Sequence, residues 1–106
     1  MFTDIGTGQV SHGREEVREA VKGLFATFSD LHIDRTSNIA QGSMLAHEFM
    51  MSGVHSGSVP GLDATGMSFS LAGAIVAETR DGKISRATEY WNMADLLSQV
   101  GALPGR

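Results

Sequence analysis

A single amphipathic stripe, followed only by β-like segments, most constrains the fold of this chain. Apolar side chains recur at steps of three and four residues in one stretch near the start, at Val17, Val21, Leu24, Phe25 and Phe28. This spacing predicts one long helix from about Gly13 to Phe28. Glu15 and Glu16 fall in its first turn, where negative charge suits the helix dipole.

Four β-like segments follow the helix, which Ser29-Asp30 is expected to close. They run over Leu31 to Ile39, Met44 to Ser52, Met67 to Thr79 and Ile84 to Asn92. Asp81-Gly82 between the last two is a strong hairpin signal. The glycine-containing segment Gly53 to Gly66 predicts a loop. Ala94 to Val100 predicts a short closing helix, ended by Gly101 and Pro104. The order predicts an α+β fold in which an antiparallel meander packs against one long helix.

Composition is that of one globular domain. The chain has 106 residues, of which 42% are hydrophobic and 19% charged, so residues 1–106 are expected to form a single domain. A net charge of -4 without a run of Lys or Arg argues against nucleic acid and anionic membranes as partners. The absence of cysteine excludes disulfides and thiolate chemistry. No signal peptide or apolar span of ~20 residues is visible, so we expect a cytoplasmic protein.

Several short motifs occur in a recognisable order along nearly the whole chain. They are Gly13-Arg14-Glu15-Glu16-Val17, Gly53-Val54-His55-Ser56-Gly57, Ala64-Thr65-Gly66, Asp81-Gly82-Lys83-Ile84, Glu89-Tyr90-Trp91-Asn92 and Leu96-Leu97-Ser98-Gln99-Val100-Gly101. Together they resemble the SnoaL-like polyketide cyclase branch of the nuclear-transport-factor-2-like superfamily. The resemblance implies a cone: a curved antiparallel sheet, made of the four-strand meander plus a short N-terminal strand, around an apolar pocket.

The start of the chain departs from the family pattern. Family members usually have one or two helices before the first strand, and these cover the mouth of the cone. Here the sequence starts at about that strand, near Phe2. An open cone leaves apolar surface bare, so the departure predicts a homodimer in which a second copy covers it.

Glu89 is the first candidate for chemistry. The family's cyclases carry a general acid/base carboxylate on the last strand, and counting from Gly82-Lys83-Ile84 places that carboxylate at Glu89. A carboxyl group among apolar side chains has a raised pKa and exchanges protons near neutral pH. Strand alternation places Trp91 on the same face. In the alternative interpretation, Glu89 is solvated on the outer face and Tyr90 points inward.

Family relatives place a second polar group on the neighbouring strand, and this sequence offers none there. A two-residue turn at Asp81-Gly82 places Ala74 opposite Glu89, whereas a turn with a bulge places Gly73 opposite and Ile75 on the diagonal. A lone acid moves a proton but does not easily stabilise an oxyanion. This weakens the case for an enzyme.

Asp4 is the second candidate. The stretch Phe2-Thr3-Asp4-Ile5-Gly6 resembles the strand end that carries the proton-shuttling base of the steroid isomerases. The commoner role of an aspartate at a turn is to bond nearby backbone N–H groups. Further residues expected to line a pocket are Trp91, Phe49, Phe69, Ile75 and His47. A histidine such as His47 is more often satisfied within a core or surface. Metal-ligand spacings and cofactor motifs are missing, so we expect neither metal nor cofactor.

Three functions stay open. The first is a cyclase, isomerase or hydrolase that acts through Glu89 on a hydrophobic, carbonyl-bearing or epoxide-like small molecule. The second is a non-catalytic binder of an apolar ligand, and the third is a dimerisation module. Fold alone does not choose among them, because one fold hosts many functions. The sequence does not name the ligand.

Overall fold

The computed structural model describes residues 1–58 and 63–101 of the chain. Within these ranges the chain forms two helices and one six-stranded sheet. In chain order the elements are β1 (Phe2–Asp4), β2 (Val10–Ser11), α1 (Gly13–Thr27), β3 (Phe28–Gln41), β4 (Met44–His55), β5 (Ser68–Arg80), β6 (Lys83–Trp91) and α2 (Met93–Gln99). The predicted α+β fold is confirmed. Pro104 and the middle of the predicted loop lie outside the described residues.

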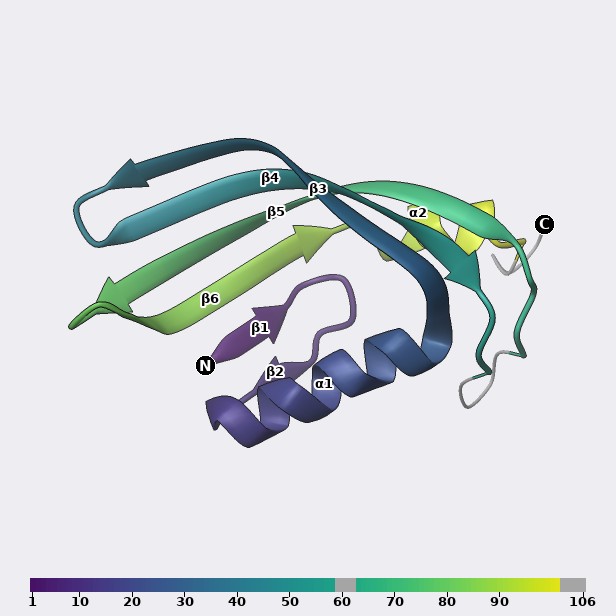
Figure 1. The fold of residues 1–106 in the computed structure, drawn as a ribbon, viewed down its shortest axis with the longest axis horizontal. Coiled ribbons are helices and arrows are strands. Elements are labelled where there is room, and N and C mark those ends of the chain that lie inside the picture. Colours follow the sequence, from purple (N-terminus) through teal and green to yellow (C-terminus); the bar gives the residue numbers. More distant parts are fainter. Residues whose placement is uncertain (59–62, 102–106) are drawn as a thin grey trace.

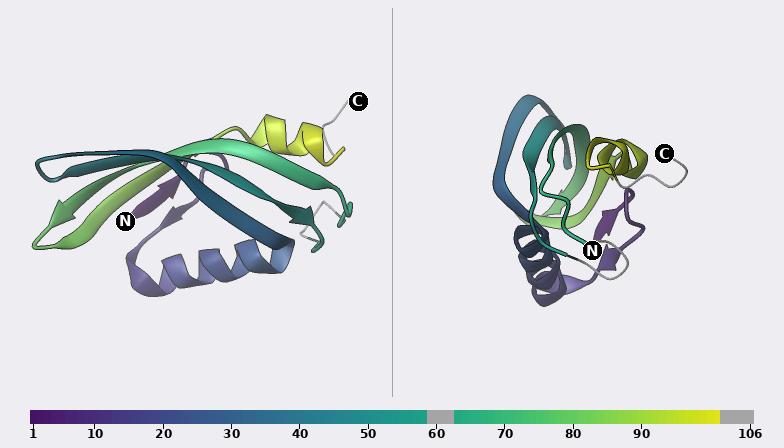
Figure 2. Two further views of the ribbon diagram at one scale, coloured as in Figure 1. Left: turned by 45° about the horizontal axis from the view of Figure 1, so that its top comes forward. Right: turned by 90° about the vertical axis from the view of Figure 1, so that its right-hand side faces the viewer.

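The sheet is curved, and α1 lies across its concave side (Figures 1 and 2). Its strand order is β2-β1-β6-β5-β4-β3. Strands β3 to β6 form the predicted antiparallel meander. The short N-terminal strand β1 pairs with β6 in parallel, so the sheet is mixed rather than wholly antiparallel. The β1–β6 pairing brings the start of the chain beside the last strand of the sheet.

Helix α1 passes into β3 without a closing turn. Phe28, the first residue after the helix, is already extended and pairs with His55 of β4. The prediction that Ser29-Asp30 closes the helix is therefore wrong. These residues lie inside β3, where Asp30 has a φ of 54° and the register shifts between Ser29 and His32. A bulge of this kind bends a strand, which suits a curved sheet.

The β5–β6 hairpin decides which residue faces Glu89. Asp81 and Gly82 both have positive φ, as a two-residue type I′ turn requires. Thr79 then pairs with Ile84 but Glu78 pairs with Arg86, so Ser85 is an extra residue in β6.

This bulge shifts the rest of the pairing by one residue, and Ile75 therefore faces Glu89. The predictions that Ala74 or Gly73 faces Glu89 are both wrong. The reason is that the extra residue, Ser85, lies within β6 and not in the turn. The neighbouring strand still offers Glu89 an apolar side chain, as the sequence indicated.

The core lies where α2 covers the end of the sheet. Phe69 and Leu71 of β5 pack with Leu96 and Val100, and Phe28 meets Phe69 edge-on at 4.9 Å between ring centroids. The side-chain amide of Gln99 fixes α2 to β5. It accepts the N–H of Ser70 at 2.8 Å and donates to the Ser70 carbonyl at 2.9 Å. These contacts hold α2 where it can form one wall of a cavity.

Candidate functional site

A cavity of about 840 Å³ lies on the concave side of the sheet. Its walls come from β1, β2, α1, β6 and α2, together with the residues where β3 begins and β4 ends. Most of the wall is apolar, with contributions that include Val17, Leu24, Phe28, Leu96 and Val100. Cavities of this size and character suit small apolar ligands. Among the polar side chains in the wall, the half-buried Asp4 and Glu89 are candidates for chemistry, whereas Glu15, Glu16 and Glu19 of α1 are exposed.

Glu89 is one of these polar side chains. It is half-buried in the cavity wall together with Trp91, while Tyr90 between them is 47% exposed on the opposite face. The sequence left two orientations of Glu89 open, and the structure has the one in which Glu89 points inward. Burial in apolar surroundings, together with the negative charge of Asp4, raises the pKa of Glu89 from 4.5 to about 7.

Asp4 lies beside Glu89 because β1 and β6 pair in parallel with Asp4 opposite Glu89. Its Oδ1 atom accepts the indole Nε1–H of Trp91 at 2.6 Å and the backbone N–H of Thr7 at 3.2 Å. The bond to Thr7 is the turn role expected of this aspartate. The bond to Trp91 was not foreseen, and it holds the Asp4 carboxylate against the cavity wall. The second carboxyl group of the site thus comes from β1 and not from β5.

Gly6 is a residue that sequence reasoning missed. Its backbone lies so close to the indole ring of Trp91 that a Cβ atom on residue 6 would overlap the ring. The neighbouring Ile5 donates its N–H to the carbonyl of Glu89 at 2.9 Å, which holds the β1 end against β6. The only sequence signal was the glycine itself, which is equally explained by the turn between β1 and β2.

The other predicted pocket residues lie outside the lining of this cavity. Phe49 is buried with its ring over Gly73, and Phe69 belongs to the core under α2. His47 and Ile75 pair with each other across β4 and β5 and are partly exposed. The cavity lies between α1, β1, β6 and α2, so these side chains are excluded from its wall. Their contact with a ligand stays a prediction without support from the cavity.

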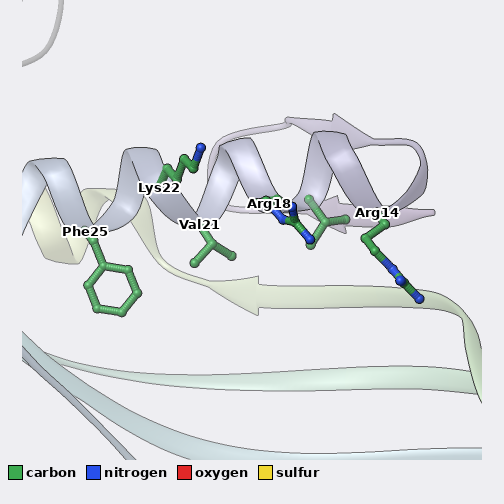
Figure 3. Close-up of a pocket in the computed structure, with 6 residues that line it drawn as sticks. Arg14, Arg18, Val21, Lys22 and Phe25 are labelled. Atoms are coloured by element: carbon green, nitrogen blue, oxygen red, sulfur yellow. The ribbon is translucent and has the colours of Figure 1, made fainter.

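A second, shallower hollow of about 490 Å³ lies along α1. Its lining consists of Arg14, Val17, Arg18, Val21, Lys22 and Phe25, and Figure 3 shows Arg14, Val21 and Phe25 projecting from the same side of the helix. Arg18 and Lys22 form exposed ion pairs with glutamates of the same helix. The lining offers no acid or nucleophile, so the chemistry of interest is in the cavity.

Residues 1–58 and 63–101 contain no group of three or more histidine, aspartate or glutamate side chains that could hold a metal ion. Neither helix in this part of the chain is long and apolar enough to cross a membrane.

Solved structures with the same architecture place the chain in a class. A hypothetical protein with a ketosteroid isomerase-like fold from Catenulispora acidiphila matches with a TM-score of 0.82 and 22% identity, over 97% of this chain and 73% of the other. TsrD from Streptomyces laurentii matches with a TM-score of 0.84 and 24% identity, over 96% and 75%. An NTF2-like protein from Burkholderia thailandensis matches with a TM-score of 0.78 and 17% identity, over 92% and 73%. The fold is therefore the NTF2-like cone.

The family follows from the sequence match. The family model of the SnoaL-like polyketide cyclases matches residues 1–100, and the chain belongs to this family. This confirms the resemblance seen in the motifs. A search of the curated proteins gave no significant match.

Proposed function

We propose that the chain binds an apolar small molecule in the 840 Å³ cavity and moves a proton on it with Glu89 as general acid/base. The observation that carries the proposal is the adjacent pair of carboxyl groups, Asp4 and Glu89, in a mostly apolar wall. With a pKa of about 7, Glu89 is present in both protonation states near neutral pH. A group so poised accepts and returns a proton without a large energetic penalty.

The remaining side chains have supporting roles in this proposal. The Asp4 carboxylate lies beside Glu89, and Trp91 and Thr7 donate hydrogen bonds to it. The apolar wall keeps water from part of the site, which strengthens electrostatic interactions there. The substrate class that fits is an apolar carbonyl compound with an exchangeable C–H beside the carbonyl, as in a polyketide ring precursor.

Proton exchange on 2-tetralone tests the acid/base role without knowledge of the natural substrate. The carboxylate of Glu89 takes the α-proton, the C–H electron pair passes into the enolate, and a deuteron returns from the carboxyl group after exchange with D₂O. NMR follows the loss of the α-proton signal. We expect acceleration over buffer, and Glu89→Gln should lose it by about 100-fold or more.

A matched control is Glu48→Gln, because Glu48 is an exposed glutamate on β4 outside the cavity. Its exchange rate should equal that of the unmodified protein. Undiminished exchange in Glu89→Gln, or an equal loss in Glu48→Gln, contradicts the proposal.

A non-catalytic binder is the second candidate, and one observation favours it. Ile75 and not a polar side chain faces Glu89 across β5, so the neighbouring strand supplies no donor for an oxyanion. This function predicts saturable binding of 2-tetralone with no acceleration of exchange. The same NMR experiment therefore separates the two functions.

Self-association is proposed for the same protein. Val21 and Phe25 of α1 are 45% and 64% exposed and project from the same side of the helix, and burial of such side chains against a second copy is favourable. Sedimentation equilibrium should give a homodimer, and Phe25→Ser should shift it toward the monomer. A monomer at all concentrations contradicts this proposal.

A further inference from the structure

Removal of a proton beside a carbonyl group places negative charge on the carbonyl oxygen. When Glu89 takes the α-proton, the C–H electron pair forms the double bond of the enolate and the carbonyl π pair moves to the oxygen. A hydrogen-bond donor at this oxygen stabilises the charge. Ile75 supplies no donor from β5, so a donor must come from another part of the cavity wall.

Most side-chain donors in the cavity wall are already engaged or out of reach. The indole N–H of Trp91 donates to Asp4, and the hydroxyl of Thr27 donates at 2.8 Å to a backbone carbonyl of its own helix. Ser11 and His55 are only 3% and 1% exposed, so a ligand has little access to them. The remaining side-chain donors of the lining lie in the turn between β1 and β2.

Thr7 and Gln9 are exposed residues of this turn, and both line the cavity. The hydroxyl oxygen of Thr7 accepts the backbone N–H of Gln9 at 3.1 Å, and the backbone N–H of Thr7 donates to Asp4. Thr7 therefore has a structural role, which is to hold the turn and the backbone of Gln9 in place. The side chain of Gln9 is longer and carries an amide with two N–H donors. Gln9 is thus the stronger candidate.

Gln9 lies in the same row of the sheet as the two carboxyl groups. The N–H of Asp4 donates to the carbonyl of Gln9 at 2.8 Å, which extends the β1–β2 pairing by one residue, and Asp4 pairs in turn with Glu89. Side chains of directly paired residues lie on the same face of a sheet. The backbones of Gln9 and Glu89 are two strand spacings, or roughly 10 Å, apart. Their long side chains can therefore meet at a single carbonyl group in the cavity.

We infer that the side-chain amide of Gln9 donates a hydrogen bond to the carbonyl oxygen of the substrate and stabilises this oxygen as it becomes an enolate. The inference rests on the proposed proton transfer by Glu89 and adds the group that stabilises the resulting charge. The oxygen bound by Gln9 and the carbon deprotonated by Glu89 belong to one carbonyl compound and are neighbours in it. An uncharged donor also suits an uncharged ketone in a mostly apolar wall.

Gln9→Met tests the inference, because methionine keeps an unbranched side chain and removes the donor. The saturating rate of deuterium exchange on 2-tetralone should fall by about tenfold, a smaller loss than at a buried oxyanion site because the amide is exposed to water. Gln41→Met is the matched control, since Gln41 is exposed at the end of β3 outside the cavity, and it should exchange like the unmodified protein. An undiminished rate in Gln9→Met, or an equal loss in the control, overturns the inference.

Binding of 2-naphthol and naphthalene supplies a second readout that needs no turnover. 2-Naphthol has the flat ring and the oxygen of the 2-tetralone enolate, whereas naphthalene lacks the oxygen. Gln9→Met should weaken the binding of 2-naphthol by about tenfold and leave that of naphthalene unchanged. A merely structural effect of the substitution would weaken both equally, and that result contradicts the role of Gln9.

The inference and the proposed function fail in different ways. If the unmodified protein neither binds 2-naphthol nor accelerates exchange, the proposed function fails and the role of Gln9 fails with it. If the unmodified protein accelerates exchange and Gln9→Met does so equally, the donor alone fails and the role of Glu89 stands.

Discussion

Replacement of Glu89 by glutamine keeps the shape of the side chain and removes its ionisable group. In the folded protein the pKa of Glu89 is about 7, against an ordinary value of 4.5. Between these pH values the folded state holds a proton that the unfolded state has released. The free energy of unfolding of the unmodified protein therefore falls as the pH rises through this range. The contribution is complete below about pH 4.5 and lost above about pH 7.

The size of the effect follows from the same two values. Each step of one in pKa corresponds to about 1.4 kcal/mol, so a rise from 4.5 to about 7 corresponds to about 3.5 kcal/mol. The carboxyl group is only half-buried, and solvent at the cavity mouth screens it. We expect a measured change of about 1–2 kcal/mol. The difference in free energy of unfolding between Glu89→Gln and the unmodified protein should therefore grow in favour of the variant by this amount as the pH rises from about 5 to about 8.

Urea unfolding at several pH values, followed by circular dichroism, measures this difference. Subtraction of the two curves removes the titration of the four histidines, which both proteins share. Glu48→Gln is the control for the loss of one exposed carboxyl group, and the difference for Glu89→Gln should vary clearly more with pH. A flat difference for Glu89→Gln, or one of the opposite sign, refutes the assignment of a raised pKa to Glu89.

Two further substitutions test the surroundings of Glu89, and a third serves as a control. Asp4→Asn removes the neighbouring charge, so the pKa of Glu89 should fall below about 7 but stay above 4.5, because burial is its main cause; carboxyl ¹³C NMR follows the titration, and an unchanged midpoint contradicts the role of Asp4. Gly6→Ala should displace the indole ring of Trp91, lower the free energy of unfolding by about 1–3 kcal/mol and shift the fluorescence of this single tryptophan; an unchanged spectrum and stability would show that the two residues are not in contact. Gly23→Ala is the matched control on α1, where a Cβ meets open space, and it should raise the stability by about 0.5–1 kcal/mol in the same urea assay; a loss of stability would contradict a regular helix there.

Local patterns were enough to predict most of the fold. The three- and four-residue spacing located α1, and Asp81-Gly82 located the β5–β6 turn, because both signals depend on neighbours in sequence. Boundaries were less predictable. Gly53 to His55 were assigned to a loop but extend β4, since β5 and β3 supply hydrogen-bond partners that no local pattern reveals.

The site depended on contacts between residues far apart in sequence. One extra residue in β6, Ser85, set the residue opposite Glu89, and a bulge within a strand leaves no clear local signature. The contact of Asp4 with Trp91 joins residues 87 positions apart. Glu89 itself was predictable, because the family motif placed it and strand alternation put it on the side of Trp91.

The source of the second carboxyl group changes the chemistry expected of the site. A carboxyl group at the Ile75 position of β5 would lie beside Glu89 on the neighbouring strand. The two groups would have similar surroundings and would share one proton. Asp4 instead lies at the end of β1, where the N–H groups of Trp91 and Thr7 bind its carboxylate, whereas Glu89 lies in apolar surroundings. Different surroundings suit two carboxyl groups to different roles. Under the proposed function, Asp4 supplies the neighbouring charge and Glu89 carries the proton. Proton transfer would then need no polar residue at Ile75, and loss of the Trp91–Asp4 contact should impair it even when Glu89 is intact.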